Sequence, residues 1–279
     1  MQRYRQLGVK RLCDWLGVST SGFYAWEKRD ASTRYHEDQK LLERISKIYW
    51  QSEGRYGSPR VYQTLLSQGI RVGRKRVERL MREAGLQGRV VQVTRRQPGL
   101  KRFKAQGNNL RLKMDEPTAI NQIWVGDVTY LKLNGQWQYL ATVMDLYSRR
   151  IIGWSLSATR TVQLTCSALN YALRKRGFPT EVVFHTDRGI EYMGTDFQQL
   201  LRKQCFKHSV NRPKHCTDNA HMESFYHSLK AELIRGTVFK SLKAMRQALA
   251  RYINRFYNAV RLHSGLDYLS PIQFEQRAA

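Results

Sequence analysis

The Asn134-Gly135 pair is the feature of this sequence that most constrains its fold. It separates two runs rich in β-branched and aromatic residues, 123–133 and 137–146. Asn-Gly favours a two-residue type I′ turn, whose twist joins two antiparallel strands directly. The sequence therefore predicts a β-hairpin, and a third strand at 151–156 follows after a short turn.

Helix and strand patterns alternate downstream of the hairpin. They predict a helix, a strand, a second helix and a second strand, at 162–176, 181–185, 195–204 and 206–210. Together with the three strands before them, these elements begin in the order β-β-β-α-β-α, which is that of a ribonuclease H-like fold. We therefore expect an α/β core with a mixed five-stranded sheet, completed by helices at 218–234 and 242–260.

Three carboxylates are placed where such a fold brings side chains to one edge of its sheet. Asp127 lies in the first predicted strand, Asp187 lies just past the fourth, and Glu223 follows 36 positions later in a helix. Neighbouring carboxylates repel one another unless a cation neutralises them, and Mg²⁺ prefers oxygen ligands. We predict that Asp127, Asp187 and Glu223 are catalytic and hold two Mg²⁺ ions suited to phosphoryl transfer. The competing interpretation is that they are ordinary surface acids.

Other residues near the predicted site have a functional and a structural interpretation. Asp145 is an alternative ligand that we interpret as structural, and Glu191 falls in a loop and is not expected to be a ligand. His185 either orients a ligand or packs in the core, because it would face the same side of its strand as Asp187. Lys230 lies two helical turns beyond the glutamate, where its ammonium either binds phosphate or is solvated. Further candidates are Arg188, His215 and Asn219.

The chain carries a formal charge of +26, and the excess is spread along its whole length. Residues 1–117 hold 26 Lys and Arg against 11 Asp and Glu, and residues 118–279 hold 22 against 11. A polyanionic partner is the simplest cause, since phosphate contacts by basic side chains release counterions; the alternative is a merely soluble basic surface. The sequence has no apolar run of about eighteen residues and no apolar signal core at its start, so we expect no membrane span and a cytoplasmic location.

Four segments are predicted along the chain. They are a helix-turn-helix segment, a second helical DNA-binding domain of similar type, a basic linker and the catalytic core, at 1–33, 34–84, 85–117 and 118–279. In the first, two short helices flank Gly17-Val18 and form either a helix-turn-helix or a plain helical hairpin. The linker, with a short strand at 89–93 as one option, either orders along DNA or acts as a plain tether.

The helix predicted at 74–82 is the basic element best suited to DNA. It has an apolar face and five basic residues, a pattern that a solvated charged helix also shows. The DNA-binding candidates on it are Arg74, Lys75, Arg76 and Arg79, to which Arg188 and Lys230 of the core are added.

The four cysteines do not form a metal-binding pattern. Cys205 and Cys216 lie near His208 and His215, which makes a zinc site conceivable, but the paired cysteine spacing of zinc sites is missing. We therefore expect reduced, structural thiols.

Three motifs make the chain resemble a known family. W-x-x-D-x-T-Y at 124–130, H-x-D-R-G at 185–189 and D-N-A-x-M-E-S-F at 218–225 are similar to those of the DDE transposases of bacterial insertion sequences, which are relatives of retroviral integrases. More narrowly, they resemble the second-reading-frame product, OrfB, of the insertion-sequence-3 family. The 35 residues between the second aspartate and the glutamate, and Lys230 seven positions later, also match that family.

This resemblance implies a metal-dependent DNA strand transferase that acts on double-stranded DNA, at the terminal inverted repeats of its element and at a target. It implies Mg²⁺ as cofactor, with Mn²⁺ as a substitute, and contact of Lys230 with terminal DNA. It also implies homo-oligomers on DNA, a copy-out, paste-in route and a bacterial, nucleoid-associated location.

Two other functions fit the same sequence. The first is a DNA-binding partner that is inactive without fusion to an upstream OrfA product, since the chain begins close to its first helix-turn-helix with no coiled-coil heptads before it. The second is a structure-selective nuclease, which would cut branched DNA regardless of end sequence.

Overall fold

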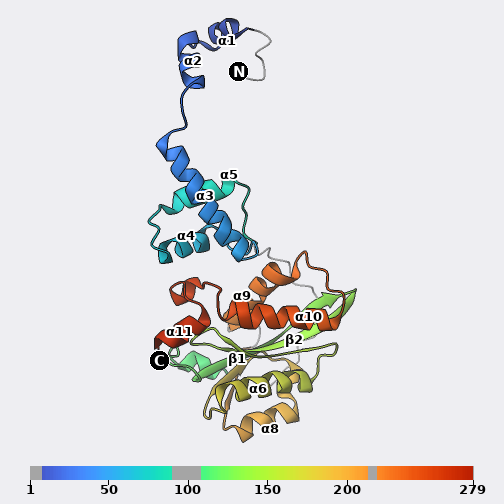
Figure 1. Ribbon diagram of the computed structural model, residues 1–279. Helices are drawn as coiled ribbons and strands as arrows, with labels where there is room; N and C mark the ends of the chain where they lie inside the picture. The colour runs from blue at the N-terminus through green and yellow to red at the C-terminus, as the bar shows by residue number, and fades with distance from the viewer. Residues whose placement is uncertain (1–7, 90–107, 213–218, 279) are drawn as a thin grey trace. The chain divides into compact units, whose positions relative to one another are not determined.

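The computed structural model describes residues 8–89, 108–212 and 219–278 (Figure 1). Contacts within the chain gather in two units, residues 1–88 and residues 89–279. The predicted linker falls largely outside the described residues, and the four-part division of the chain stays a prediction. No helix in the described ranges is long and apolar enough to cross a membrane.

The N-terminal unit begins with two short helices, α1 (Val9–Leu16) and α2 (Thr20–Glu27). Gly17 ends α1 with a φ of 65°, a left-handed conformation that suits glycine. Ser19 caps α2, and its hydroxyl accepts the Gly22 N–H at 3.0 Å. The two helices around a glycine turn are therefore confirmed.

Three further helices form the rest of this unit, namely α3 (Thr33–Gln51), α4 (Ser58–Ser67) and α5 (Arg74–Glu83). Each of them contacts the other two. Their apolar residues recur at helical spacing and are buried: Leu41, Ile45, Ile48, Val61, Leu65, Val77, Leu80 and Met81. The second predicted helical segment is therefore an all-α cluster.

The C-terminal unit is built on a five-stranded sheet with the order β3-β2-β1-β4-β5. Strands β1 (Ile123–Leu133), β2 (Gln136–Asp145) and β3 (Ile151–Ser157) form an antiparallel meander. Strands β4 (Val183–Thr186) and β5 (Lys207–Val210) continue the sheet in parallel with β1. The predicted mixed five-stranded sheet is therefore confirmed.

The turn between β1 and β2 has the geometry that the Asn-Gly pair predicts. Asn134 has a φ of 48° and Gly135 a φ of 84°, so both residues are left-handed, as a type I′ turn requires. This turn fixes the register in which Asp127 of β1 stands opposite Thr142 of β2.

Helices cover both sides of the sheet (Figure 1). One side packs against α6 (Val162–Arg176) and α8 (Thr195–Lys203), and these helices share a core that includes Trp124 and Phe184. The other side packs against α9 (Ala220–Leu229) and α10 (Leu242–Ala250). Shorter elements in this unit are a 3₁₀ turn at Leu110–Lys113, α7 (Ile190–Met193), a 3₁₀ turn at Ser264–Leu266 and α11 (Pro271–Ala278).

The two long helices predicted near the C-terminus do not continue as regular α-helix. A π-helical segment, Lys230–Ile234, follows α9, and another, Arg251–Tyr257, follows α10. The two segments are linked by a hydrogen bond, in which the Tyr252 hydroxyl of the second donates to the Glu232 carboxylate of the first at 2.8 Å. The same carboxylate forms a buried ion pair with Arg261 at 2.8 Å. The predicted helices at 218–234 and 242–260 are therefore present, and the last part of each is π-helical.

Candidate active site

The two predicted aspartates occupy neighbouring positions at the edge where β4 ends. Strands β1 and β4 run parallel, and their last paired residues are Gly126 and Thr186. Asp127 follows within β1 and Asp187 follows just past the end of β4, and neighbouring strands are only about 4.8 Å apart. The Gly189 N–H donates to Asp187 Oδ1 at 2.9 Å and orients that carboxylate. The sheet topology thus produces the acidic pair that the strand pattern predicted.

The pKa of Asp127 lies well above its usual range. Burial is the largest cause, and the negative charge of Asp187 is the second. Glu191 acts in the same direction, whereas a hydrogen bond from the Val128 N–H and the charge of Arg160 act against it. Asp187 is therefore close enough for its negative charge to act on Asp127.

Helix α9, which carries Glu223, is fixed to β1 at the position of Asp127. The Tyr226 hydroxyl donates to the Asp127 backbone carbonyl at 2.6 Å and lies 2.7 Å from Thr142 Oγ1. Asn219, just before the helix, donates from Nδ2 to the Gly126 carbonyl at 3.3 Å. Glu223 lies four residues after Asn219 and three residues before Tyr226. Helical spacing therefore puts it on the same side of α9 as these two residues.

The structure does not by itself form a three-carboxylate cluster. In the part of the chain that it describes, no three His, Cys, Asp or Glu side chains gather closely enough to hold a metal ion. The pairing of Asp127 with Asp187 is present, and the convergence of Glu223 with them stays a prediction. His215 and Cys216, two members of the conceivable zinc site, lie outside the described residues.

Glu191 is the site residue whose environment the sequence did not indicate. It lies in α7, not in a loop, and its side chain is only 1% exposed. Arg160 donates to its Oε1 from Nε at 2.9 Å and from Nη2 at 2.6 Å. Its Oε2 is buried and has no hydrogen-bond partner among the residues that the structure describes. This ion pair adds one negative and one positive charge beside the two aspartates, and no local motif signals it because 31 positions separate its members.

Lys230 lies within electrostatic reach of the site. Burial lowers its pKa, and the charge of Asp127 opposes that effect. Its ammonium lies 4.8 Å from the centre of the Tyr130 ring, at cation–π distance. The ammonium is therefore half-buried and interacts electrostatically with Asp127.

Three other predicted candidates have structural partners. His185 is fully buried, and its Nδ1 lies 2.8 Å from Ser209 Oγ. Arg188 donates from Nε to the Asn211 carbonyl at 2.7 Å. Asp145 is fully buried and accepts the Asn121 N–H at 2.8 Å, which supports its interpretation as a structural residue.

In the N-terminal unit, the basic residues of α5 divide into two groups. Arg76 and Arg79 each lie 2.6 Å from a carboxylate oxygen of Asp38, and these bonds lower the pKa of that carboxyl. Arg74 and Lys75 are exposed. The contact of all four with DNA stays a prediction, and the ion pairs show that Arg76 and Arg79 also tie α5 to α3.

Comparison with known proteins places this geometry in a family. Models of an integrase core domain match residues 117–216 and 223–278, and a model of a helix-turn-helix-like domain matches 36–94. The transposase InsF for insertion sequence IS3A of Escherichia coli K12 is 38% identical over 278 residues, which cover 98% of this chain and 95% of InsF. The chain belongs to the IS3-family transposases. The resemblance drawn from the sequence motifs is thereby confirmed.

Other known proteins are similar to this transposase. A 31 kDa protein of insertion element IS600 from Shigella sonnei is 34% identical over 266 residues, covering 95% of this chain and 98% of that protein. Among solved structures, a chain of the simian T-cell lymphotropic virus intasome covers 83% of this chain and 74% of its own, with 16% identity and a TM-score of 0.49. The HTLV-2 integrase catalytic core in complex with magnesium covers 56% of this chain and 97% of its own, with 22% identity and a TM-score of 0.44.

Membership in this family identifies the chain as a transposase, an enzyme of the polynucleotidyl transferase class with an integrase-type core. The helix-turn-helix-like and integrase domains imply that it binds DNA.

Proposed function

We propose that this transposase cleaves a phosphodiester bond at the end of its element and joins the freed 3′-hydroxyl to a second phosphodiester, using Asp127, Asp187 and Glu223. The observation that supports this most directly is the pairing of two half-buried carboxylates, in which burial and the charge of Asp187 raise the pKa of Asp127. Paired carboxylates of this kind are suited to phosphoryl transfer when a cation neutralises them.

The donor set fits magnesium, with manganese as a substitute. Carboxylate oxygens are hard ligands, and a divalent cation would relieve the repulsion that raises the pKa of Asp127. Asp127 and Asp187 would share the ions, and Glu223 would complete the second site. When bound, two such ions supply charge neutralisation and activate the attacking oxygen.

The chain's own residues supply position and charge. Tyr226 and Asn219 hold α9 on β1 through hydrogen bonds to the Asp127 and Gly126 carbonyls, and this anchoring would direct Glu223 to the acidic pair. Lys230 would bind a backbone phosphate of the terminal DNA close to Asp127. In-line positioning and charge neutralisation contribute most to reactions of this type, so a covalent protein–DNA intermediate is not required.

The DNA partners would be the terminal inverted repeats and a target duplex. Arg74 and Lys75 of α5, together with Arg76, Arg79 and Arg188, would contact backbone phosphates. We further propose that the enzyme works as a homo-oligomer on DNA in the bacterial cytoplasm at the nucleoid, with an OrfA product as fusion or partner.

The test supplies the full chain with a precut element end, a target duplex and Mg²⁺. We expect the wild type to join the strands and Asp127→Asn to lose joining by several orders of magnitude while DNA affinity stays nearly unchanged. Asp196→Asn, which changes an exposed aspartate on α8, is the matched control and should join like the wild type. Full joining by Asp127→Asn would reject the carboxylate site. Binding without joining by the wild type would favour the DNA-binding partner role.

A further inference from the structure

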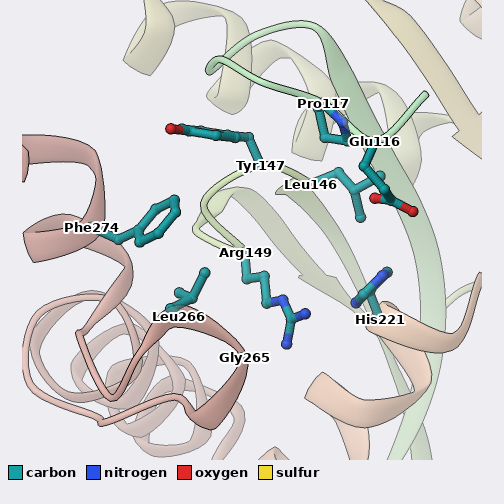
Figure 2. Close-up of a pocket in the computed structure, with 9 residues that line it drawn as sticks. All are labelled: Glu116, Pro117, Leu146, Tyr147, Arg149, His221, Gly265, Leu266 and Phe274. Carbon is teal, nitrogen blue, oxygen red and sulfur yellow. The ribbon is translucent and has the colours of Figure 1, made fainter. Parts of the chain in front are cut away.

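The C-terminal unit contains a small pocket that is lined by His221 of α9 and does not include Glu223 (Figure 2). It has a volume of about 180 Å³ and is lined by the turn between β2 and β3, the first turn of α9 and the segment near Gly265. Pockets for drug-sized ligands usually span about 300–1,000 Å³. This one therefore suits a single small group.

Arg149 is the principal charged group of the pocket. It lies in the turn between β2 and β3 with a φ of 56°, which is uncommon for a residue other than glycine and is typical of functional positions. Its side chain extends into the pocket toward His221 (Figure 2). Among the described residues no carboxylate forms an ion pair with Arg149, whereas the adjacent Arg150 pairs with Glu275.

Gly265 provides the surface on which this guanidinium rests. A Cβ added at position 265 would lie 2.3 Å from Arg149 Nη1 and 2.7 Å from its Cζ. Because the guanidinium packs directly against the glycine backbone, any side chain at 265 would displace it. The pocket thus holds an arginine side chain in place by contact, with no carboxylate partner in the described part of the chain.

Glu116 is the carboxylate that lines the pocket. Its side chain is 81% exposed and lies 3.4 Å from the Arg111 guanidinium, which engages it from outside the lining. Among the described residues, Arg149 is therefore the charged group of the pocket that has no ion-pair partner.

The walls of the pocket add an apolar surround. Leu146, Leu266 and Phe274 line it beside the charged groups. Apolar walls lower the local dielectric and strengthen the attraction between a guanidinium and an anion.

We infer that this pocket binds one backbone phosphate of a DNA strand, with Arg149 as the donor. A guanidinium fits phosphate with two parallel hydrogen bonds, and the pocket has the size and charge for that group. His221 lies two residues before Glu223 at the start of α9, so a phosphate held there would place its strand along the helix that carries the predicted catalytic glutamate. The inference depends on the DNA strand transfer proposed above, and it adds a DNA contact outside the acidic site.

The experiment measures the affinity of the full-length protein for a fluorescent element-end duplex over a range of salt concentrations. Arg149→Gln should bind roughly tenfold more weakly and should reduce the slope of log K against log salt by about 0.9, the share of one phosphate contact. Gly265→Ala keeps the net charge but displaces the guanidinium, and it should lose a similar share of affinity. Lys243→Gln, which removes an exposed lysine of α10, is the control and should change both values less.

Several results would overturn the inference. One is that Gly265→Ala binds the duplex with wild-type affinity and that Arg149→Gln loses no more affinity than Lys243→Gln does. Another is a Gly265→Ala protein that melts like the wild type and binds DNA equally well. If inorganic phosphate raises the Tm of the wild type, but not of Arg149→Gln, while the DNA affinity of both is equal, the pocket takes a free anion and not DNA. These experiments measure DNA binding, whereas the Asp127→Asn assay measures strand joining. A failure of the pocket inference can therefore be distinguished from a failure of the proposed catalytic function.

Discussion

The buried ion pair between Glu232 and Arg261 gives a sharp test of how the π-helical segment after α9 is held. Both side chains are less than 10% exposed, and Arg261 Nη2 lies 2.8 Å from Glu232 Oε1. Arg261 also donates to Ser228 Oγ at 3.0 Å. Burial alone would lower the pKa of Arg261, but the charge and hydrogen bonds of Glu232 raise it above its usual value. The Arg261 guanidinium therefore stays charged.

Replacing Arg261 by methionine should destabilise the C-terminal unit strongly. The substitution leaves the Glu232 carboxylate buried without the guanidinium, and breaking a buried pair in this way costs about 3–5 kcal/mol. For a domain of this size each kcal/mol lowers the Tm by roughly 2–4 °C, so the expected decrease at pH 7 is about 10 °C. The double variant Glu232→Met/Arg261→Met should regain most of this loss, because it removes both charges.

The loss in Arg261→Met should depend on pH. Without the guanidinium, the buried Glu232 carboxylate is better tolerated in its neutral form. The loss should therefore be smaller in acid than at neutral pH. Thermal unfolding of the full chain, followed by circular dichroism at several pH values, measures this. Arg251→Met, at an exposed arginine of the neighbouring π-helical segment, is the control. An Arg261→Met protein that melts like this control at neutral pH would refute the reasoning.

Three further changes test other contacts of the two units. Glu191→Gln removes a negative charge beside Asp127 but leaves Arg160, so the Mg²⁺ concentration for half-maximal strand joining should rise. Tyr226→Phe deletes the hydroxyl that donates to the Asp127 carbonyl; it should cost about 1–3 kcal/mol in thermal unfolding and reduce joining more than DNA affinity. Asp38→Asn should lower the Tm of the N-terminal unit at pH 7; because the folded pKa of Asp38 is depressed, the wild type should lose the same stability as pH falls below about 4.

The sequence predicted elements well where the signal is local. The bounds of β1 agree with the predicted strand, and α6 agrees with the predicted helix 162–176. Both depend on periodicity within one segment and on nearby turn residues such as Asn134-Gly135. The π-helical turns after α9 and α10 were not predictable in this way, because they accompany contacts among Glu232, Tyr252 and Arg261 that no short window contains.

The same distinction applies to side chains that carry charge. The pattern of α5 indicated its basic surface, but it gave no sign that Asp38 of α3 engages Arg76 and Arg79, since those partners are 38 and 41 positions away. Arg160 was likewise missed, because its partner Glu191 is buried by the tertiary fold and belongs to no local motif. Charge patterns therefore identify candidate surfaces, and only the packed structure shows which charges are already paired.

Glu223 shows how a local pattern and the packed structure combine. The helical spacing of the sequence gave α9 a buried side, and the structure shows what that side contacts: the backbone of β1 at Gly126 and Asp127. Asn219 and Tyr226 bind these two neighbouring carbonyls from positions seven residues apart, about two helical turns. A helix held at both points cannot rotate about its axis without breaking both bonds. In the proposed three-carboxylate site, Tyr226 and Asn219 would hold the helix in place while the Glu223 side chain approaches the aspartates, so loss of either contact should reduce strand joining.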